Sequence, residues 1–129
     1  MIAAGLLAVG GFLAVRSATT RPAVAIAPSA VDFGPVAERA SRVVAIRNLG
    51  RAPLQILAVS TSCGCTTAVA ETSRVAPGNS TRLVITFDPV GHGPEEGPAR
   101  HAVYLRTDDP ARPELEVEVR AIVVKGQNR

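Results

Sequence analysis

Residues 114–124 read ELEVEVRAIVV, and this stretch decides the class of fold. Apolar and charged residues alternate along it, which is the period of a β-strand whose successive side chains point to opposite faces of a sheet. One face carries Leu115, Val117 and Val119, whereas the other carries glutamate and arginine. The pattern is typical of an antiparallel sheet with one face in the core and the other in water.

Shorter stretches of the same kind precede this strand, separated by turns rich in glycine, proline, asparagine and aspartate. The expected strands are a broken first one with Val24, Ile26, Val31 and Phe33, then residues 42–48, 54–60, 63–69, 80–87, 99–107 and 114–124. Pro28 interrupts the first strand, which we therefore expect at the edge of a sheet. The count and the turn spacing predict an all-β, seven-stranded immunoglobulin-like sandwich over residues 30–124. A linker and the start of the first strand, over residues 19–29, precede it, and a polar tail over residues 125–129 follows.

An ordered set of short motifs runs through this domain. They are Val31-x-Phe33-Gly34, Ile46-Arg47-Asn48-Leu49-Gly50, Leu54-x-Ile56, Ser62-Cys63-Gly64-Cys65-Thr66, Pro77-Gly78, Phe87-Asp88-Pro89 and Thr107-Asp108-Asp109-Pro110. Together they resemble the bacterial family known as domain of unknown function 1573, related to the Hydin-like immunoglobulin-like domains. The resemblance covers residues 30–124 and implies a seven-stranded immunoglobulin-like sandwich, usually exported, with no established chemistry. The chain departs from the family at Asp108, where asparagine is more usual, and in a longer, more acidic loop over residues 91–98.

The first residues predict a membrane element. Residues 2–15 read IAAGLLAVGGFLAV, without charge or proline. As a helix they would span about 21 Å, against a bilayer core of about 30 Å. We interpret residues 1–18 as an uncleaved signal anchor, with a cleaved signal peptide and a buried core helix as the alternatives. The residues expected to meet lipid or a partner helix are Gly5, Leu6, Leu7, Gly10, Gly11, Phe12 and Leu13.

This anchor predicts a single-pass protein of the bacterial inner membrane, with the β-domain in the periplasm. Arg16 and Arg21 follow the apolar segment, and by the positive-inside rule they favour the opposite orientation. The expected partners are the lipid bilayer and other protein subunits of a membrane complex. The predicted helix is shorter than the bilayer core is thick, and contact with another protein would compensate for this difference in length.

Composition argues against two other classes of protein. The chain has 14 lysines and arginines against 11 aspartates and glutamates, and its aromatic content is 3%. The basic residues are scattered, so neither the charge cluster nor the stacking aromatics of a nucleic-acid binder is visible. Two histidines, two cysteines and one lysine are a thin supply of catalytic groups. We expect no catalytic residues, no cofactor and no enzymatic activity.

The Cys63-Gly64-Cys65 motif carries the strongest chemical signal. In a strand both sulfur atoms would share one face. Four interpretations are open: a strained disulfide, a soft-metal site such as Cu(I), a redox pair, or two small buried side chains beside a tight glycine turn. A metal would need a third ligand, and the sequence offers His92 and His101.

The remaining polar candidates have plain explanations. His92 lies between two glycines and is expected in solvent, and His101 is expected at a strand end or on the surface. Paired acids at residues 95–96 and 108–109 lack the spacing of a calcium loop. The sequence therefore favours a non-catalytic, membrane-anchored domain that acts as a structural or assembly subunit. A thiol-based metal (copper) or redox carrier using Cys63 and Cys65, and a secreted domain released after cleavage, are the alternatives.

Overall fold

Strand β9 (Glu114–Val123) lies inside a five-stranded sheet, as its alternating sequence predicts. The apolar residues of its inward face are all buried: Leu115, Val117, Val119, Ala121 and Val123. The computed structural model describes residues 20–93 and 95–125. Within these residues there is no helix of the length and apolarity that a membrane crossing requires.

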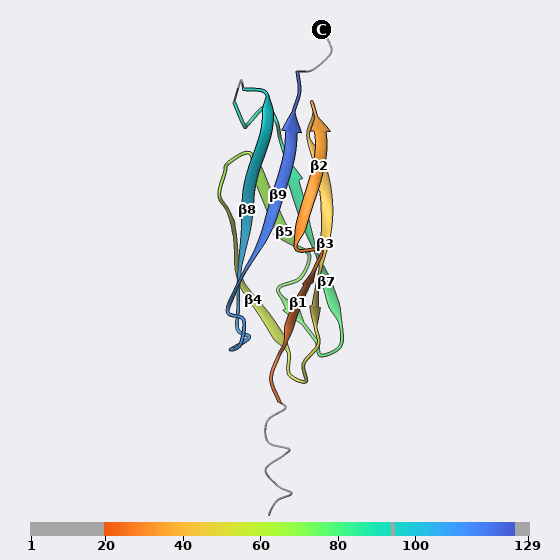
Figure 1. Cartoon of the computed structure of the whole chain (residues 1–129). Helices are drawn as coiled ribbons and strands as arrows, with labels where there is room; N and C mark the ends of the chain where they lie inside the picture. The colour runs from red at the N-terminus through yellow and green to blue at the C-terminus, as the bar shows by residue number, and fades with distance from the viewer. Residues whose placement is uncertain (1–19, 94, 126–129) are drawn as a thin grey trace, which may run out of the picture.

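The described chain is an all-β sandwich of two sheets (Figure 1). Its strands are β1 (Val24–Ala27), β2 (Ala30–Val36), β3 (Ala40–Asn48), β4 (Leu54–Thr61), β5 (Thr66–Ala70), β6 (Arg74–Val75), β7 (Ser80–Phe87), β8 (Gly97–Thr107) and β9. A four-stranded sheet has the order β1-β3-β7-β5, and a five-stranded sheet has the order β2-β9-β8-β4-β6. All pairs are antiparallel except β2 with β9.

The expected count of seven strands is wrong, because the described residues form nine. The predicted first strand divides at Pro28: β1 joins one sheet and β2 joins the other. Proline has no N–H to donate to a ladder, so pairing stops there and the chain crosses between the sheets. Both halves lie at sheet edges, which confirms the expected edge position. The other additional strand is β6, a two-residue partner of β4.

The fourth predicted strand also begins later than expected. Cys63, Gly64 and Cys65 form a turn, and β5 starts at Thr66. The two cysteines therefore do not share the face of a strand. Residues 63–69 are too short a stretch for their sequence pattern to distinguish a strand from a turn followed by a strand.

The predicted anchor over residues 1–18 lies outside the described residues, with Gly5, Leu6, Leu7, Gly10, Gly11, Phe12 and Leu13. Residues 19–29 are expected to hold a linker and the start of the first strand, and their described part contains β1. Of the predicted tail, only Lys125 is described, and it is exposed.

A buried asparagine organises the end of the sandwich at which the described chain enters. Asn48 is 0% exposed, and its side-chain oxygen accepts hydrogen bonds from the N–H groups of Ala23 at 3.1 Å and Gly50 at 3.0 Å. Its amide group donates to the carbonyl oxygens of Ala52 at 2.8 Å and Val75 at 3.0 Å. One side chain thus joins four separate points of backbone.

Asp109 serves the same end of the molecule. It is 3% exposed, and it accepts hydrogen bonds from the N–H groups of Val24 at 2.9 Å and Ala111 at 2.9 Å. Its neighbour Asp108 accepts from the N–H of Gln55 at 2.8 Å. The carboxylates of Asp108 and Asp109 are therefore occupied by hydrogen bonds from backbone N–H groups. We call this region, built on Asn48 and Asp109, the entry end.

Candidate functional site

The opposite end of the sandwich holds the turn between β4 and β5 and the loop between β7 and β8 (Figure 1). In the turn, the hydroxyl of Thr61 donates to the carbonyl oxygens of Cys63 and Thr66, both at 3.0 Å. The N–H of Cys65 donates to the sulfur of Cys63 at 3.0 Å. A disulfide bond joins Cys63 to Cys65. The turn therefore holds both sulfur atoms in one place.

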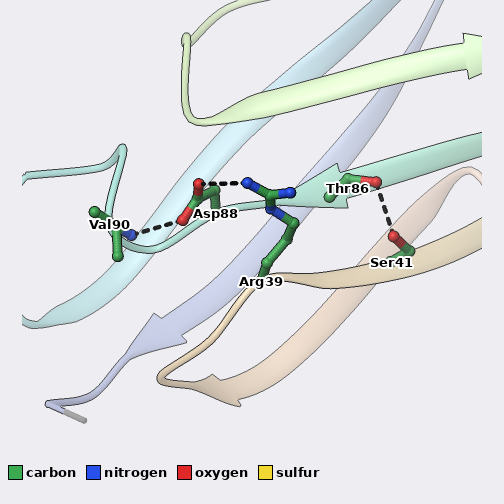
Figure 2. A network of polar contacts seen from close by, with 5 residues as sticks. All are labelled: Arg39, Ser41, Thr86, Asp88 and Val90. Carbon is green, nitrogen blue, oxygen red and sulfur yellow. Dashed lines mark hydrogen bonds and ion pairs between the residues drawn. The ribbon is translucent and has the colours of Figure 1, made fainter.

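The loop after β7 is tied directly to this turn. The N–H of Asp88 donates to the carbonyl oxygen of Cys65 at 2.8 Å. The Asp88 carboxylate accepts from the N–H of Val90 at 3.0 Å and meets the guanidinium of Arg39 at 3.5 Å, as Figure 2 shows. Beside it, the hydroxyls of Ser41 and Thr86 join β3 to β7 at 2.8 Å (Figure 2). These contacts fix the start of the loop that carries His92.

The next residues bring His92 over the cysteines. The N–H of Gly91 donates to the carbonyl of Asp88 at 3.1 Å, and the N–H of His92 donates to the carbonyl of Pro89 at 3.2 Å. A Cβ on Gly91 would lie 3.4 Å from the Cα of Cys65, so the loop backbone packs closely on the turn. His92 is half-buried, which corrects the expectation that it lies in solvent.

His101 reaches the same place from the five-stranded sheet. It lies within β8, opposite Val119 of β9, and is half-buried. It shares the inward-facing side of β8 with Ala99 and Val103, both buried. The expectation of a surface or strand-end residue is therefore wrong. The strand begins earlier than the sequence indicated, at Gly97, and this places position 101 on the inner face of its interior.

Four side chains from these elements meet at one point. One ligand atom from each of Cys63, Cys65, His92 and His101 lies within 4.8 Å of every other. The Nε2 atom of His101 is 3.4 Å from the Nδ1 atom of His92. Within the described part of the chain, no other place gathers three or more such side chains. The two remaining candidates, Glu95 and Glu96, are exposed and stand apart from this group.

Phe87 forms the inner wall of the cluster. Its ring is 0% exposed and lies 6.0 Å from the ring of His92 and 6.2 Å from that of His101. On its other side it meets Phe33 at 6.0 Å. These separations are those of favourable aromatic pairs. The histidines are therefore positioned by the hydrophobic core as well as by the loop.

The surroundings also favour the neutral imidazole at His101. Burial lowers the pKa of His101 below its usual value, and the adjacent His92 lowers that pKa further. Burial and a like charge both act against the protonated form. The neutral imidazole has a free lone pair on one ring nitrogen, and this neutral form is the one that binds a metal ion.

The sequence identified all four residues but did not predict that they lie close together. From the sequence, His92 and His101 were candidates for a third metal ligand only because they are the two histidines of the chain. The spacing of residues 63, 65, 92 and 101 does not reveal that a turn, a loop and a strand converge. The alternation of β8 contained a usable signal, since His101 stands in phase with Val103 and Leu105. Two further contributors, Phe87 and Asp88, were predicted only as a strand and its terminating turn.

These features define a small two-sheet β-sandwich with a cysteine and histidine cluster at one end. The chain belongs to the DUF1573 family, whose description is a protein of unknown function and whose profile matches residues 24–123. No curated protein matches the sequence.

Two solved structures place the fold among known ones. A protein of unknown function from Porphyromonas gingivalis W83 is 26% identical, with a TM-score of 0.75 over 86% of this chain and 51% of its own. The chain thus spans about half the length of that relative. The PapD-like domain 7 of human CEP192 is 11% identical, with a TM-score of 0.66 over 98% of this chain and 99% of its own. The second likeness shows the fold alone.

Proposed function

We propose that this domain is a thiol-based metal carrier that holds one soft or borderline cation, Cu(I) or Zn(II), between Cys63, Cys65, His92 and His101. The observation that supports it is the convergence of the four ligand atoms within 4.8 Å. Two thiolates and two imidazoles are a donor set that such d¹⁰ ions favour, usually in tetrahedral geometry.

The spacing of the histidines supports the same proposal. Two imidazole nitrogens on a tetrahedral zinc ion are about 3.3 Å apart, given Zn–N distances near 2.05 Å. The Nε2 atom of His101 and the Nδ1 atom of His92 lie 3.4 Å apart. The same contact serves as a hydrogen bond between the rings when one nitrogen carries a proton. To bind the ion, the two cysteine sulfurs would have to be reduced to thiolates and move apart, since they are bonded to one another.

The test is metal titration of the reduced full chain in mild detergent, under anaerobic conditions. We expect one Co(II) ion per chain with the intense visible bands of tetrahedral coordination and a thiolate charge-transfer band. Zn(II) and Cu(I) should displace it. Replacing either histidine by alanine should weaken zinc binding about 100-fold, and the double variant Cys63→Ser, Cys65→Ser should abolish the charge-transfer band.

A matched control is Glu95→Ala, which removes a potential oxygen ligand from the same loop. Glu95 is exposed and lies outside the cluster, so its loss should leave the zinc affinity unchanged. If the histidine variants bind zinc as tightly as the unaltered chain, the proposal is wrong.

A second proposal concerns the setting of the domain. We propose that residues 1–18 anchor it, as an immunoglobulin-like module, in the bacterial inner membrane, where it is a non-catalytic periplasmic subunit of a larger complex. The apolar run over residues 2–15 supports this, and so does the position of β1, the first described strand, at the end opposite the turn between β4 and β5 (Figure 1). The cluster would then face away from the bilayer.

This proposal predicts that the chain fractionates with membranes and co-purifies with defined subunits in mild detergent. The double variant Cys63→Ser, Cys65→Ser should still assemble, because the described chain begins at the entry end, far from the cluster. Recovery of the chain from the soluble fraction, without its first residues by N-terminal sequencing, would instead identify a cleaved signal peptide.

A further inference from the structure

We propose that the bond between Cys63 and Cys65 is a redox gate on the metal site, so that the domain takes up its ion only after a thiol has reduced it. This inference rests on the proposed metal-binding function. The same two sulfur atoms form the disulfide and half of the ligand cluster. A thiolate is the form of cysteine that binds metal, and a disulfide sulfur carries no such charge. Oxidation and metal binding therefore exclude one another.

The two sulfur atoms differ in how an incoming thiol can reach them. Cys65 is 2% exposed, whereas Cys63 is half-buried. Gly64 is exposed, and apart from Cys63, Gly64 and Cys65 themselves no residue has a heavy atom within 4 Å of the place where its Cβ would be. Since exchange requires direct attack on a sulfur atom, access makes Cys63 the point of attack and Cys65 the leaving group.

The surroundings of Cys65 suit a departing thiolate. The hydroxyl of Thr66 lies 3.6 Å from its sulfur and can donate a hydrogen bond to it. The histidine nitrogens lie within 4.8 Å of the same atom. A hydrogen bond to a thiolate favours the charged form, and so favours the release of Cys65.

A hollow beside the turn offers space for a small thiol next to Gly64, although Cys63 is not among the residues that line it. It has a volume of about 390 Å³ and is lined by Arg39, Ser41, Gly64, Cys65, Thr67, Thr86 and Asp88. Figure 2 shows Arg39 and Asp88 side by side at this place, with Ser41 and Thr86 next to them. The Arg39 side chain is 70% exposed, so its positive charge is accessible to an approaching thiolate.

The exchange reaction balances with a dithiol as reductant. The thiolate of the dithiol forms a bond to the sulfur of Cys63, the Cys63–Cys65 bond breaks, and its electron pair passes to Cys65. The second thiol of the reductant then displaces Cys63 and closes the reductant's own disulfide. Two electrons have moved to the protein, and both cysteines are free to bind the ion. In reverse, a small-molecule disulfide accepts two electrons from the cysteines and the ion leaves.

The gate is tested on the full chain in detergent by comparing two oxidation states. One sample is reduced with dithiothreitol, freed of it anaerobically and titrated with Zn(II) against a chromophoric chelator. The other is first oxidised with glutathione disulfide. We expect the reduced chain to bind at least about 100-fold more tightly, since the oxidised chain keeps only the two imidazoles. Adding glutathione disulfide to the zinc-loaded chain should release the metal.

The outcomes separate the two proposals. If both forms bind zinc equally, the gate is refuted while the metal site stands. If neither form binds zinc, the proposed function is wrong and the gate falls with it. Tight binding by the reduced form alone supports both.

The direction of attack is tested with single-cysteine variants. Cys65→Ser leaves Cys63 as the only thiol, and Cys63→Ser leaves Cys65. With glutathione disulfide, mass spectrometry should show the mixed disulfide forming about 10-fold faster or more on Cys63, because Cys65 is buried. Circular dichroism serves as the control that both variants are folded. Equal rates would overturn the assignment of Cys63 as the attacked atom.

Discussion

Phe87→Ala should lower the free energy of unfolding by about 4 kcal/mol. Phe87 is 0% exposed and lies between Phe33 and the two histidines, so its removal leaves a cavity that the surrounding strands cannot close. The loss can be measured by urea denaturation followed by circular dichroism. An effect below about 1 kcal/mol would mean that the core relaxes around the site, contrary to the close packing described above.

The same residue links stability to metal binding, and Phe33 provides the matched control. Both rings are buried, but only Phe87 pairs with His92 and His101. The milder variants Phe87→Leu and Phe33→Leu both keep an apolar side chain. We expect Phe87→Leu to weaken zinc binding about 10-fold by loosening the histidines, and Phe33→Leu to leave it unchanged. Equal effects would show that the aromatic wall does not position the ligands.

Asn48→Ala should lower the free energy of unfolding by about 3 kcal/mol. Its side chain makes hydrogen bonds with four backbone groups, and it is 0% exposed. Alanine would leave these donors and acceptors without a protein partner. Thermal unfolding should occur about 15 °C lower, since about 1 kcal/mol corresponds to about 5 °C in a domain of this size.

Asn79→Ala is the control for this prediction. Asn79 is exposed in the turn before β7, and its hydrogen bonds with Ala76 and Asn48 use backbone atoms only. Its substitution should change the free energy of unfolding by less than about 0.5 kcal/mol. Hydrogen exchange offers a further check, because the Asn48 variant should expose the amides of Ala23 and Gly50 first. If Asn48→Ala behaves like Asn79→Ala, the buried amide does not hold the entry end together.

Gly50 shows why the entry end tolerates little change. A Cβ at this position would lie 2.6 Å from the nitrogen of Ala23 and 2.7 Å from the carbonyl carbon of Pro22. The sequence motif that contains Asn48 and Gly50 is one of those that carry the family resemblance. The structure gives it a physical role, which is to close the chain entry against the body of the sandwich.

Much of the fold was predictable because strand alternation is a local property. The positions in β9 that alternate between apolar and charged are the positions that the structure buries and exposes. The turns at Pro77-Gly78 and Asp88-Pro89 were predictable for the same reason, since proline and glycine restrict or widen the backbone angles of their own residues. The family resemblance also followed from the order of such motifs along the chain.

The division of the first strand at Pro28 and the inward position of His101 depended on the tertiary structure. Pro28 signalled an interruption, but only the pairing of β1 with β3 and of β2 with β9 decided that the two halves belong to different sheets. A sequence records where pairing must stop. Which partner each half finds depends on the packing of residues far apart along the chain.

The sequence by itself determined the all-β class, the family and the presence of two cysteines and two histidines. Only the tertiary structure decided that these four side chains meet. Strand alternation and turn chemistry involve only a few neighbouring residues, so they can be recognised in a single sequence. The cluster joins the turn at Cys63 and Cys65 to His92 in a loop and to His101 on the inner face of another strand. Its geometry therefore depends on how two sheets pack, and no local pattern in the chain contains that information.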